Sequence, residues 1–194
     1  KIALAYHQVI GGSRKTRFVG REKGYHGVGF GGISVGGISS NQEAFKASLL
    51  PGTMHLPHTH NLSKMAFSKG QPLWGAHLAD DLERLIKENG AETIAAVIVE
   101  PMQGSAGVIV PPQGYLEKLR SICDMHHVLL IFDEVITGFG RLGEWFSPNR
   151  LGVIPDMITF AKGVTSGVVP LGGVLVRDEI YYELMTGPDH LVEF

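Results

Sequence analysis

Two charged residues stand at the ends of two apolar segments that are rich in β-branched residues. The run 129–132 ends on Asp133, and the segment 157–161 ends on Lys162. Each run predicts a buried strand of a parallel sheet that carries its polar residue at the carboxyl end. Because open α/β sheets bind ligands outside those strand ends, the sequence predicts that a carboxylate and an amine lie in one crevice.

Two interpretations fit a carboxylate and an amine in one crevice. Chemistry with pyridoxal phosphate (PLP) needs a lysine that forms a Schiff base and an aspartate that faces the ring nitrogen. The alternative is a buried Asp–Lys ion pair with a structural role, because a charged residue that ends a strand is common. These two residues alone leave both interpretations open.

The segments that must position these residues alternate between strand and helix. Strands are expected at 16–20, 94–99, 128–132, 157–161 and 174–176, and helices at 1–10, 78–90 and from Pro112 onward. The helix 78–90 shows leucine at helical spacing and ends at Gly90, where a C-terminal stop belongs. Three strand–helix–strand passages predict an α/β fold, with a twisted, mainly parallel sheet and helices on both faces.

Two further segments lack a regular pattern. Glycine is too frequent in 28–37 for a clear helix or strand, and the proline-rich segment 50–74 is predicted to be a long irregular loop. Such loops are uncommon in compact domains unless functional, so this one is expected to cover the site. His55, His58 and His60 are ligand types for zinc. Nearby prolines and the lack of a supporting cysteine favour a loop without metal.

The composition agrees with a soluble enzyme without specifying one. The 194 residues carry a net charge of −2 and 44% hydrophobic residues. This balance predicts no binding to nucleic acid, and no apolar run approaches the roughly 18 residues of a membrane span. The one cysteine, Cys123, excludes an internal disulfide and falls on the apolar side of a predicted helix. We therefore expect a cytoplasmic protein that is not bound to a membrane.

Four motifs resemble the class III (ω-amino acid) aminotransferases of PLP fold type I, and they occur in family order. They are Tyr25-His26-Gly27, Glu100-Pro101-Met102-Gln103-Gly104, the run from Asp133 to Arg141, and Phe160-Ala161-Lys162-Gly163. Any one motif is a weak signal, but four at family spacing favour catalysis over a structural ion pair. The segments 27–32, 55–59 and 70–72 resemble the β-alanine–pyruvate (ω-amino acid–pyruvate) branch of the family.

The resemblance implies PLP as the cofactor and assigns roles around its ring. Lys162 would carry the cofactor and, once freed, move the proton between substrate and cofactor. Asp133 would keep the pyridine nitrogen protonated, so that the ring remains an electron sink. Val135 would pack under the ring if the strand geometry persists for two more residues. Tyr25 would stack on the opposite face.

Other motif residues have less defined roles. Glu100 is expected either to support the cofactor site through a hydrogen bond or to be a structural carboxylate paired with Arg141 or a backbone amide. His26 is expected to orient Asp133. Gly138, Gly140 and Arg141 are expected to shape a tight turn rather than to contact substrate.

The reaction implied by the resemblance is transfer of an amino group from β-alanine or another ω-amine to pyruvate, in a homodimer or higher oligomer. Ser105 and Ile136 replace a glutamate and a glutamine of relatives that use glutamate, which favours pyruvate as acceptor. The alternatives are a taurine–pyruvate aminotransferase and a glutamate-1-semialdehyde-type aminomutase. A dinucleotide-binding module is disfavoured, because Gly29, Gly31 and Gly32 do not match the spacing that it requires.

The resemblance covers only the middle of a typical family member. Residues 1–194 would form the central part of the PLP-binding large domain. The Gly-Ser phosphate-binding turn would precede Lys1. A threonine that reaches the phosphate from the partner subunit, and the small domain with the substrate-carboxylate arginine, would follow Phe194. An incomplete and inactive fragment is therefore a further alternative.

Overall fold

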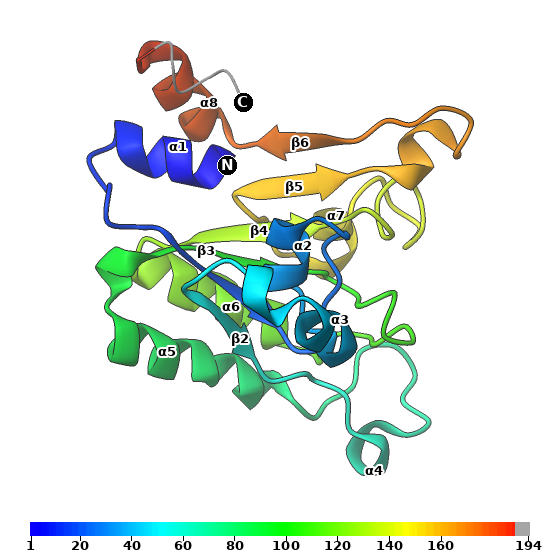
Figure 1. Ribbon diagram of the computed structural model, residues 1–194. Coiled ribbons are helices and arrows are strands. Elements are labelled where there is room, and N and C mark those ends of the chain that lie inside the picture. Colours follow the sequence, from blue (N-terminus) through cyan, green and yellow to red (C-terminus); the bar gives the residue numbers. More distant parts are fainter. Residues whose placement is uncertain (189–194) are drawn as a thin grey trace.

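The computed structural model describes residues 1–188 and confirms a mainly parallel sheet. The six strands lie in the order β2-β1-β3-β4-β5-β6, and only β6 is antiparallel to its neighbour. In Figure 1 the arrows of β4 and β5 point the same way, opposite to β6. Their bounds are β1 Arg17–Arg21, β2 Thr53–Leu56, β3 Ile94–Val99, β4 Leu129–Asp133, β5 Met157–Phe160 and β6 Gly173–Val176.

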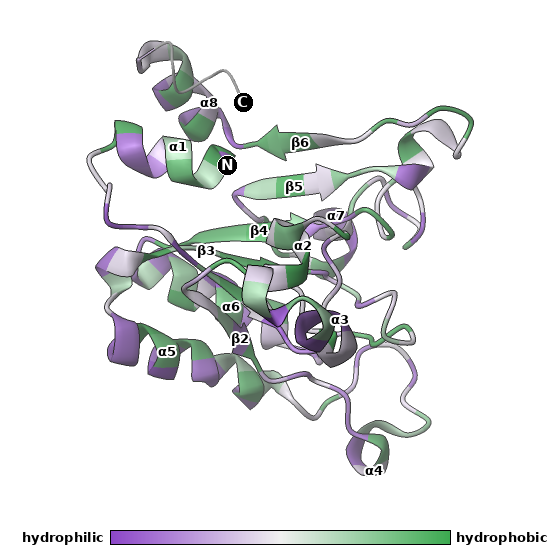
Figure 2. Cartoon of the chain, viewed as in Figure 1, coloured by the Kyte–Doolittle hydropathy of each residue, from purple (hydrophilic) through white to green (hydrophobic). Residues whose placement is uncertain are grey.

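Helices cover both faces of this sheet. On one face α5 (Asp81–Asn89) and α6 (Tyr115–Met125) pack on Val97, Val99, Leu130 and Phe132. On the other, α1 (Ile2–Val9) and α8 (Asp178–Thr186) pack on Ala96, Leu129 and Ile131 (Figure 1). β3 and β4 are therefore buried on both sides, which explains why they are coloured hydrophobic along their length in Figure 2.

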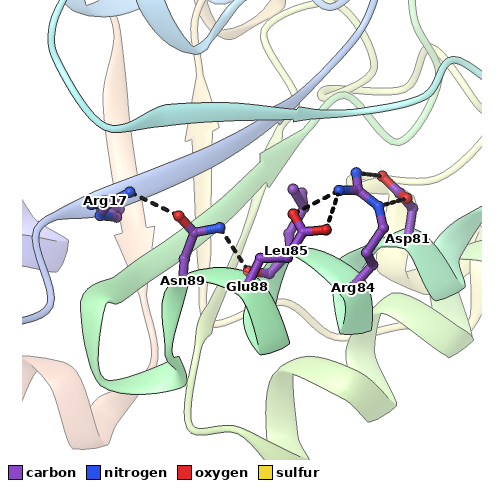
Figure 3. A network of polar contacts seen from close by, with 6 residues as sticks. All are labelled: Arg17, Asp81, Arg84, Leu85, Glu88 and Asn89. Atoms are coloured by element: carbon purple, nitrogen blue, oxygen red, sulfur yellow. Dashed lines mark hydrogen bonds and ion pairs between the residues drawn. The ribbon is translucent and has the colours of Figure 1, made fainter.

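The helices on the first face follow the sequence pattern closely. In α5 the buried residues are Leu82, Leu85 and Ile86, and Gly90 ends the helix at a φ of 84°. On the outer side Arg84 bridges Asp81 and Glu88, and Asn89 accepts a hydrogen bond from Arg17 at 2.9 Å (Figure 3).

Cys123 is buried on α6 as predicted, and burial raises the pKa of its thiol to about 12. That raised pKa suits a core residue rather than a nucleophile. The helix itself begins at Tyr115, three residues after Pro112.

The segments without a regular pattern contain the largest differences from the sequence prediction. Residues 53–56, predicted as loop, form the edge strand β2, which pairs with β1 from Phe18 and Thr53 to Arg21 and Leu56. Three of its four residues are only partly buried, so it lacks the apolar run that marks the central strands. In the glycine-rich segment, Phe30–Val35 forms α2. A Cβ at Gly20 would overlap the carbonyl oxygen of Val35, so glycine lets α2 lie directly on β1.

The remaining elements are short. They are the helices α3 (Ser39–Ala44), α4 (Leu62–Met65) and α7 (Ser147–Leu151), and 3-10 turns at Lys46–Ser48, Ala76–Asp80, Ala91–Thr93 and Lys162–Thr165. Within residues 1–188, no helix combines the length and the apolar character needed to cross a membrane.

Candidate active site

Asp133 is the last residue of β4, and its side chain is only 9% exposed. His26 Nδ1 donates a hydrogen bond to Oδ2 at 2.8 Å, and the backbone N–H of Val135 donates to Oδ1 at 3.1 Å. Because an ionised carboxylate only accepts hydrogen bonds, this contact places a proton on Nδ1 of His26. The structure thus brings His26 into contact with Asp133, as the sequence predicts.

Lys162 follows β5 after one residue, and its side chain is exposed. Its φ of 48° lies in the left-handed region. A residue with a Cβ rarely adopts this conformation, and such residues cluster at functional sites. The structural ion pair is not formed, because Asp133 receives its hydrogen bonds from His26 and Val135 and no ion pair joins it to Lys162 within residues 1–188.

Glu100 directly follows β3 and is 4% exposed. Its Oε1 accepts a hydrogen bond from the backbone N–H of Tyr25 at 2.9 Å, and its Oε2 accepts one from Gly104 at 2.8 Å. Of the partners considered for this carboxylate, the structure shows backbone amides rather than Arg141. Glu100 therefore ties the turn that carries Tyr25 to the end of a central strand.

Val135 reaches the site by a different path from the one that the sequence argument assumes. β4 ends at Asp133, and the chain then enters a series of turns. The strand geometry therefore does not persist to Val135. Its backbone N–H instead turns back to the Asp133 carboxylate, which holds the residue at the end of the strand.

All the residues predicted for the site line one cavity of about 330 Å³. They follow or end strands β1, β3, β4 and β5, whose carboxyl ends meet at one edge of the sheet, which is why distant segments converge here. These residues are Tyr25, His26, Glu100, Asp133, Val135 and Lys162, and Gly27, Ile98, Ile136 and Thr159 complete the lining.

Thr159 is the lining residue of most interest that sequence reasoning missed. It pairs in register with Asp133 between β4 and β5. Its buried hydroxyl and Nε2 of His26 have no hydrogen-bond partner within the described part of the chain. The available signal was that Thr159 is the one polar residue in the strand Met157–Phe160.

A second cavity of about 440 Å³ shares Val135, Ile136 and Lys162 with the first. The loop that follows β4 forms most of its wall, and the other lining residues are Gly138, Phe139, Gly140, Arg141 and Gly163. Arg141 was expected only to shape a tight turn. In the structure it also lines a cavity together with Lys162.

The loop that walls this second cavity is fixed at its base by Glu134, which is fully buried. The Ser147 hydroxyl donates to Oε1 at 2.6 Å, its backbone N–H donates to Oε2 at 2.8 Å, and Thr137 donates to Oε2 at 2.9 Å. Burial raises the pKa of the Glu134 carboxyl, and these hydrogen bonds act in the opposite direction. These three hydrogen bonds to one buried carboxylate hold both ends of the loop together.

Of the three histidines considered as zinc ligands and disfavoured from the sequence, His55 has a backbone partner. On β2, His55 Nε2 lies 2.7 Å from the carbonyl oxygen of Gly36. Within residues 1–188 no group of three or more His, Cys, Asp or Glu side chains is arranged to hold a metal ion.

The first cavity fits the ring of PLP. It has a carboxylate for a protonated ring nitrogen, an amine for an aldehyde, and the side chains of Tyr25 and Val135 as packing surfaces. Within residues 1–188, the buried hydroxyl of Thr159 and Nε2 of His26 have no hydrogen-bond partner, so both are free to hydrogen-bond a bound group. The cavity lining and the unpartnered polar atoms both agree with the cofactor that the motifs imply.

Comparison with known proteins points the same way. The chain is 60% identical to an omega-aminotransferase of Caulobacter vibrioides, over 100% of the chain and 44% of that protein. It is 51% identical to a beta-alanine–pyruvate aminotransferase of Pseudomonas aeruginosa, over 100% of the chain and 43% of that protein. The chain thus spans less than half the length of these relatives.

The fold is also similar to that of an enzyme of known structure. It matches an omega transaminase of Pseudomonas jessenii in complex with PMP with a TM-score of 0.86 at 34% identity, over 95% of this chain and 40% of that one. The aminotransferase class-III family description matches residues 1–190. This chain therefore belongs to the class-III aminotransferases, whose cofactor is pyridoxal phosphate.

Proposed function

We propose that this chain is the central part of the PLP-binding large domain of an aminotransferase that moves an amino group from an ω-amino acid or amine, such as β-alanine, to pyruvate. The observation that carries the proposal is the cavity in which Asp133 and Lys162 meet side chains from four strand ends. The similarity to a beta-alanine–pyruvate aminotransferase supports the choice of donor and acceptor.

The two charged residues divide the chemical work. Bound PLP would supply an electron sink for the charge that develops when a substrate carbon loses its proton. Asp133 would hold a proton at the ring nitrogen, and its hydrogen bonds to His26 and to the amide of Val135 orient the carboxylate for that contact. Lys162 would hold the cofactor and then move the proton at the carbon that bears the amino group.

The other lining residues would position the ring. Tyr25 and Val135 would pack on its two faces, and Glu100 fixes the backbone of Tyr25. Thr159, next to Asp133 in register, offers a hydroxyl to a polar group of the ring.

The acceptor is inferred from an apolar wall. Ile136 lines both cavities and packs closely against Gly104, where an added Cβ would overlap its Cδ1 atom. A hydrocarbon side chain cannot hydrogen-bond a second carboxylate. Together with the similarity to a beta-alanine–pyruvate aminotransferase, this supports pyruvate over a dicarboxylic acceptor such as 2-oxoglutarate.

We further infer that segments outside this chain complete the enzyme as a homodimer or higher oligomer. The chain covers 44% of its relative from Caulobacter vibrioides. The phosphate of PLP carries nearly two negative charges, which proteins normally hold with amide and hydroxyl donors. In the family resemblance, these donors belong to flanking segments and to a partner subunit.

A spectrophotometric assay of the full-length protein tests the reaction. PLP is added, and the absorbance of the bound cofactor is followed on addition of β-alanine and then of either pyruvate or 2-oxoglutarate. We expect β-alanine to remove the initial absorbance band, pyruvate to restore it, and 2-oxoglutarate to leave it unrestored. Restoration by 2-oxoglutarate alone would contradict the proposed acceptor, and a spectrum that no amine changes would contradict transamination.

A further inference from the structure

We propose that Arg21 and Gln103 are positioning residues of the cofactor site, because their buried side chains fix the backbone that carries Tyr25 and His26. This inference rests on the proposed function and deepens it, since it names two residues that would set the contacts of the ring from outside the cavity. Both side chains lie behind the lining of the cavity that fits PLP. Each acts on the backbone of the other residue's segment.

The side chain of Arg21 makes the first of these contacts. Arg21 ends β1 and is 1% exposed. Its Nη2 donates a hydrogen bond to the backbone carbonyl oxygen of Glu100 at 2.6 Å, and its guanidinium carbon lies 5.4 Å from the centre of the Tyr115 ring. Burying a guanidinium is costly, and the ring contact offsets only part of that cost. The arginine is therefore better explained by the backbone that it holds than by packing.

The side chain of Gln103 makes the second contact. Gln103 is fully buried, and its Nε2 donates a hydrogen bond to the backbone carbonyl oxygen of Glu22 at 2.9 Å. The backbone of Gln103 is itself paired with that of Ile109 in both directions, at 3.1 and 2.9 Å. Because its own backbone is anchored, the Gln103 amide is a fixed donor that holds Glu22 in place.

The segments 21–25 and 100–103 thus hold each other in both directions. In one direction, the Arg21 side chain binds the backbone of Glu100. In the other direction, the Glu100 carboxylate binds the backbone N–H of Tyr25, and the Gln103 amide binds the backbone of Glu22. These contacts lie on both sides of the turn, so they fix its position and its orientation together.

The turn carries two residues of the site in succession. Tyr25 lines the cavity, and His26 donates a hydrogen bond from Nδ1 to Asp133 at 2.8 Å. The turn is also closed internally, because the backbone N–H of Gly24 donates to the carbonyl oxygen of Arg21 at 2.9 Å. A displacement of this closed turn must therefore move the tyrosine ring and the bond to Asp133 together.

The alternative is that both side chains only stabilise the fold. A structural role lowers the free energy of unfolding when the side chain is removed, and it leaves the site of every folded molecule unchanged. A positioning role changes how the folded protein holds the ring of PLP. Free PLP is achiral, so circular dichroism in the absorption band of bound PLP reports the asymmetry that the protein imposes on the ring.

The experiment uses the full-length holoenzyme and three variants of the two residues. Arg21→Met and Gln103→Met keep the length of the side chain and remove its donor, and Arg21→Lys keeps a donor for the Glu100 carbonyl. Arg120→Met is the control, because Arg120 is also largely buried but pairs with Asp156. The circular dichroism per bound PLP, the rate per folded molecule with β-alanine and pyruvate, and the urea midpoint are measured for each protein.

Both methionine variants are expected to change the circular dichroism per bound PLP and to lower kcat by about 10- to 100-fold, since small misplacements of reacting groups are that costly. Arg21→Lys should recover most of both losses. Arg120→Met should lower only the urea midpoint. If the methionine variants behave like Arg120→Met, the inference is overturned.

Two further outcomes decide the matter for Arg21. If Arg21→Lys is as impaired as Arg21→Met, the hydrogen bond to Glu100 does not carry the effect and the role of Arg21 is refuted. If Arg21→Met does not fold, Gln103→Met and Arg21→Lys decide by the same measurements.

The circular dichroism separates this inference from the proposed function, because it needs bound PLP but neither an amine nor an acceptor. If no amine is transaminated but the signal still depends on Arg21 and Gln103, the proposed reaction fails and the positioning role stands. If the reaction proceeds and neither the signal nor the rate depends on these residues, the positioning role fails and the function stands.

Discussion

Two buried aspartates at opposite ends of neighbouring strands show how one sheet separates structure from chemistry. Asp156 directly precedes β5, and Asp133 ends β4, and both are 8% exposed. Asp156 accepts a hydrogen bond from the Leu130 amide at 2.7 Å and pairs with Arg120 at 2.8 Å and with Arg177 at 3.5 Å. Within residues 1–188, Asp133 has only His26 and one amide as hydrogen-bond partners.

The difference lies in where the cations are placed. At the edge of the sheet where β5 begins, Arg120 and Arg177 both pair with Asp156, so its negative charge is compensated within the fold. At the carboxyl-terminal edge the nearby cation, Lys162, makes no ion pair with Asp133 within residues 1–188, and both residues line an open cavity. A carboxylate and an amine that are held close but unpaired are available to a ligand, which is the property expected of an active site.

The largest expected effect comes from removing the amine. Lys162→Ala in the full-length protein should abolish transamination while leaving the fold intact, because the side chain is exposed and makes no hydrogen bond within the described residues. Lys69→Ala, which removes another exposed lysine, serves as the control and should keep full activity. The rate with β-alanine and pyruvate checks both variants, and borohydride fixation of the cofactor to a lysine other than Lys162 would refute the assignment.

Asp133→Asn should have the next largest effect. We expect the rate to fall by orders of magnitude more than the affinity for PLP, because the carboxylate tunes the electronics of the ring as well as holding it. Comparison of kcat with a PLP titration measures the two losses separately. If they are of equal size, Asp133 only anchors the cofactor.

Asp156→Asn should show the opposite pattern. Leaving Arg120 and Arg177 without their shared carboxylate should lower the free energy of unfolding by about 3 kcal/mol, and the rate per folded molecule should not change. Urea denaturation measures the loss, and Asp124→Asn is the control. Asp124 also pairs with Arg120, but its side chain is 62% exposed, so its loss should have little effect. If the rate per folded molecule falls in Asp156→Asn, the division between a structural Asp156 and a chemical Asp133 is wrong.

The smallest effect should be a pH dependence of stability caused by a buried histidine on the sheet face that α1 and α8 cover. His7 of α1 is 2% exposed, its Nε2 lies 2.9 Å from Ala95 O, and burial lowers its pKa below the usual 6.5. The unfolded chain therefore binds a proton first, so stability is lost as pH falls below 6.5 through the folded pKa. Urea midpoints between about pH 5 and 8 should show this loss, and His7→Gln should reduce it. An unchanged slope in that variant would show that another group is responsible.

The sequence by itself determined the central elements and the two charged residues that define the site. Asp133 and Lys162 could be placed at strand ends because apolar, β-branched runs are buried whatever their neighbours are. The helix 81–89 and its stop at Gly90 also follow from local spacing and from backbone preference. These features depend on side-chain types along a few consecutive residues, which a single sequence displays directly.

Only the tertiary structure decided which remote segments meet. β2 has no apolar run of its own and becomes a strand because β1 offers it hydrogen bonds. Glu100 could have bonded Arg141 or an amide, and the position of the Tyr25 turn settled the choice. Arg141 has the sequence context of a turn, yet packing of Phe139 against Phe160 and Gly163 brings it to the cavity of Lys162. Such contacts join residues far apart in the chain, and their energies depend on the whole fold rather than on local pattern.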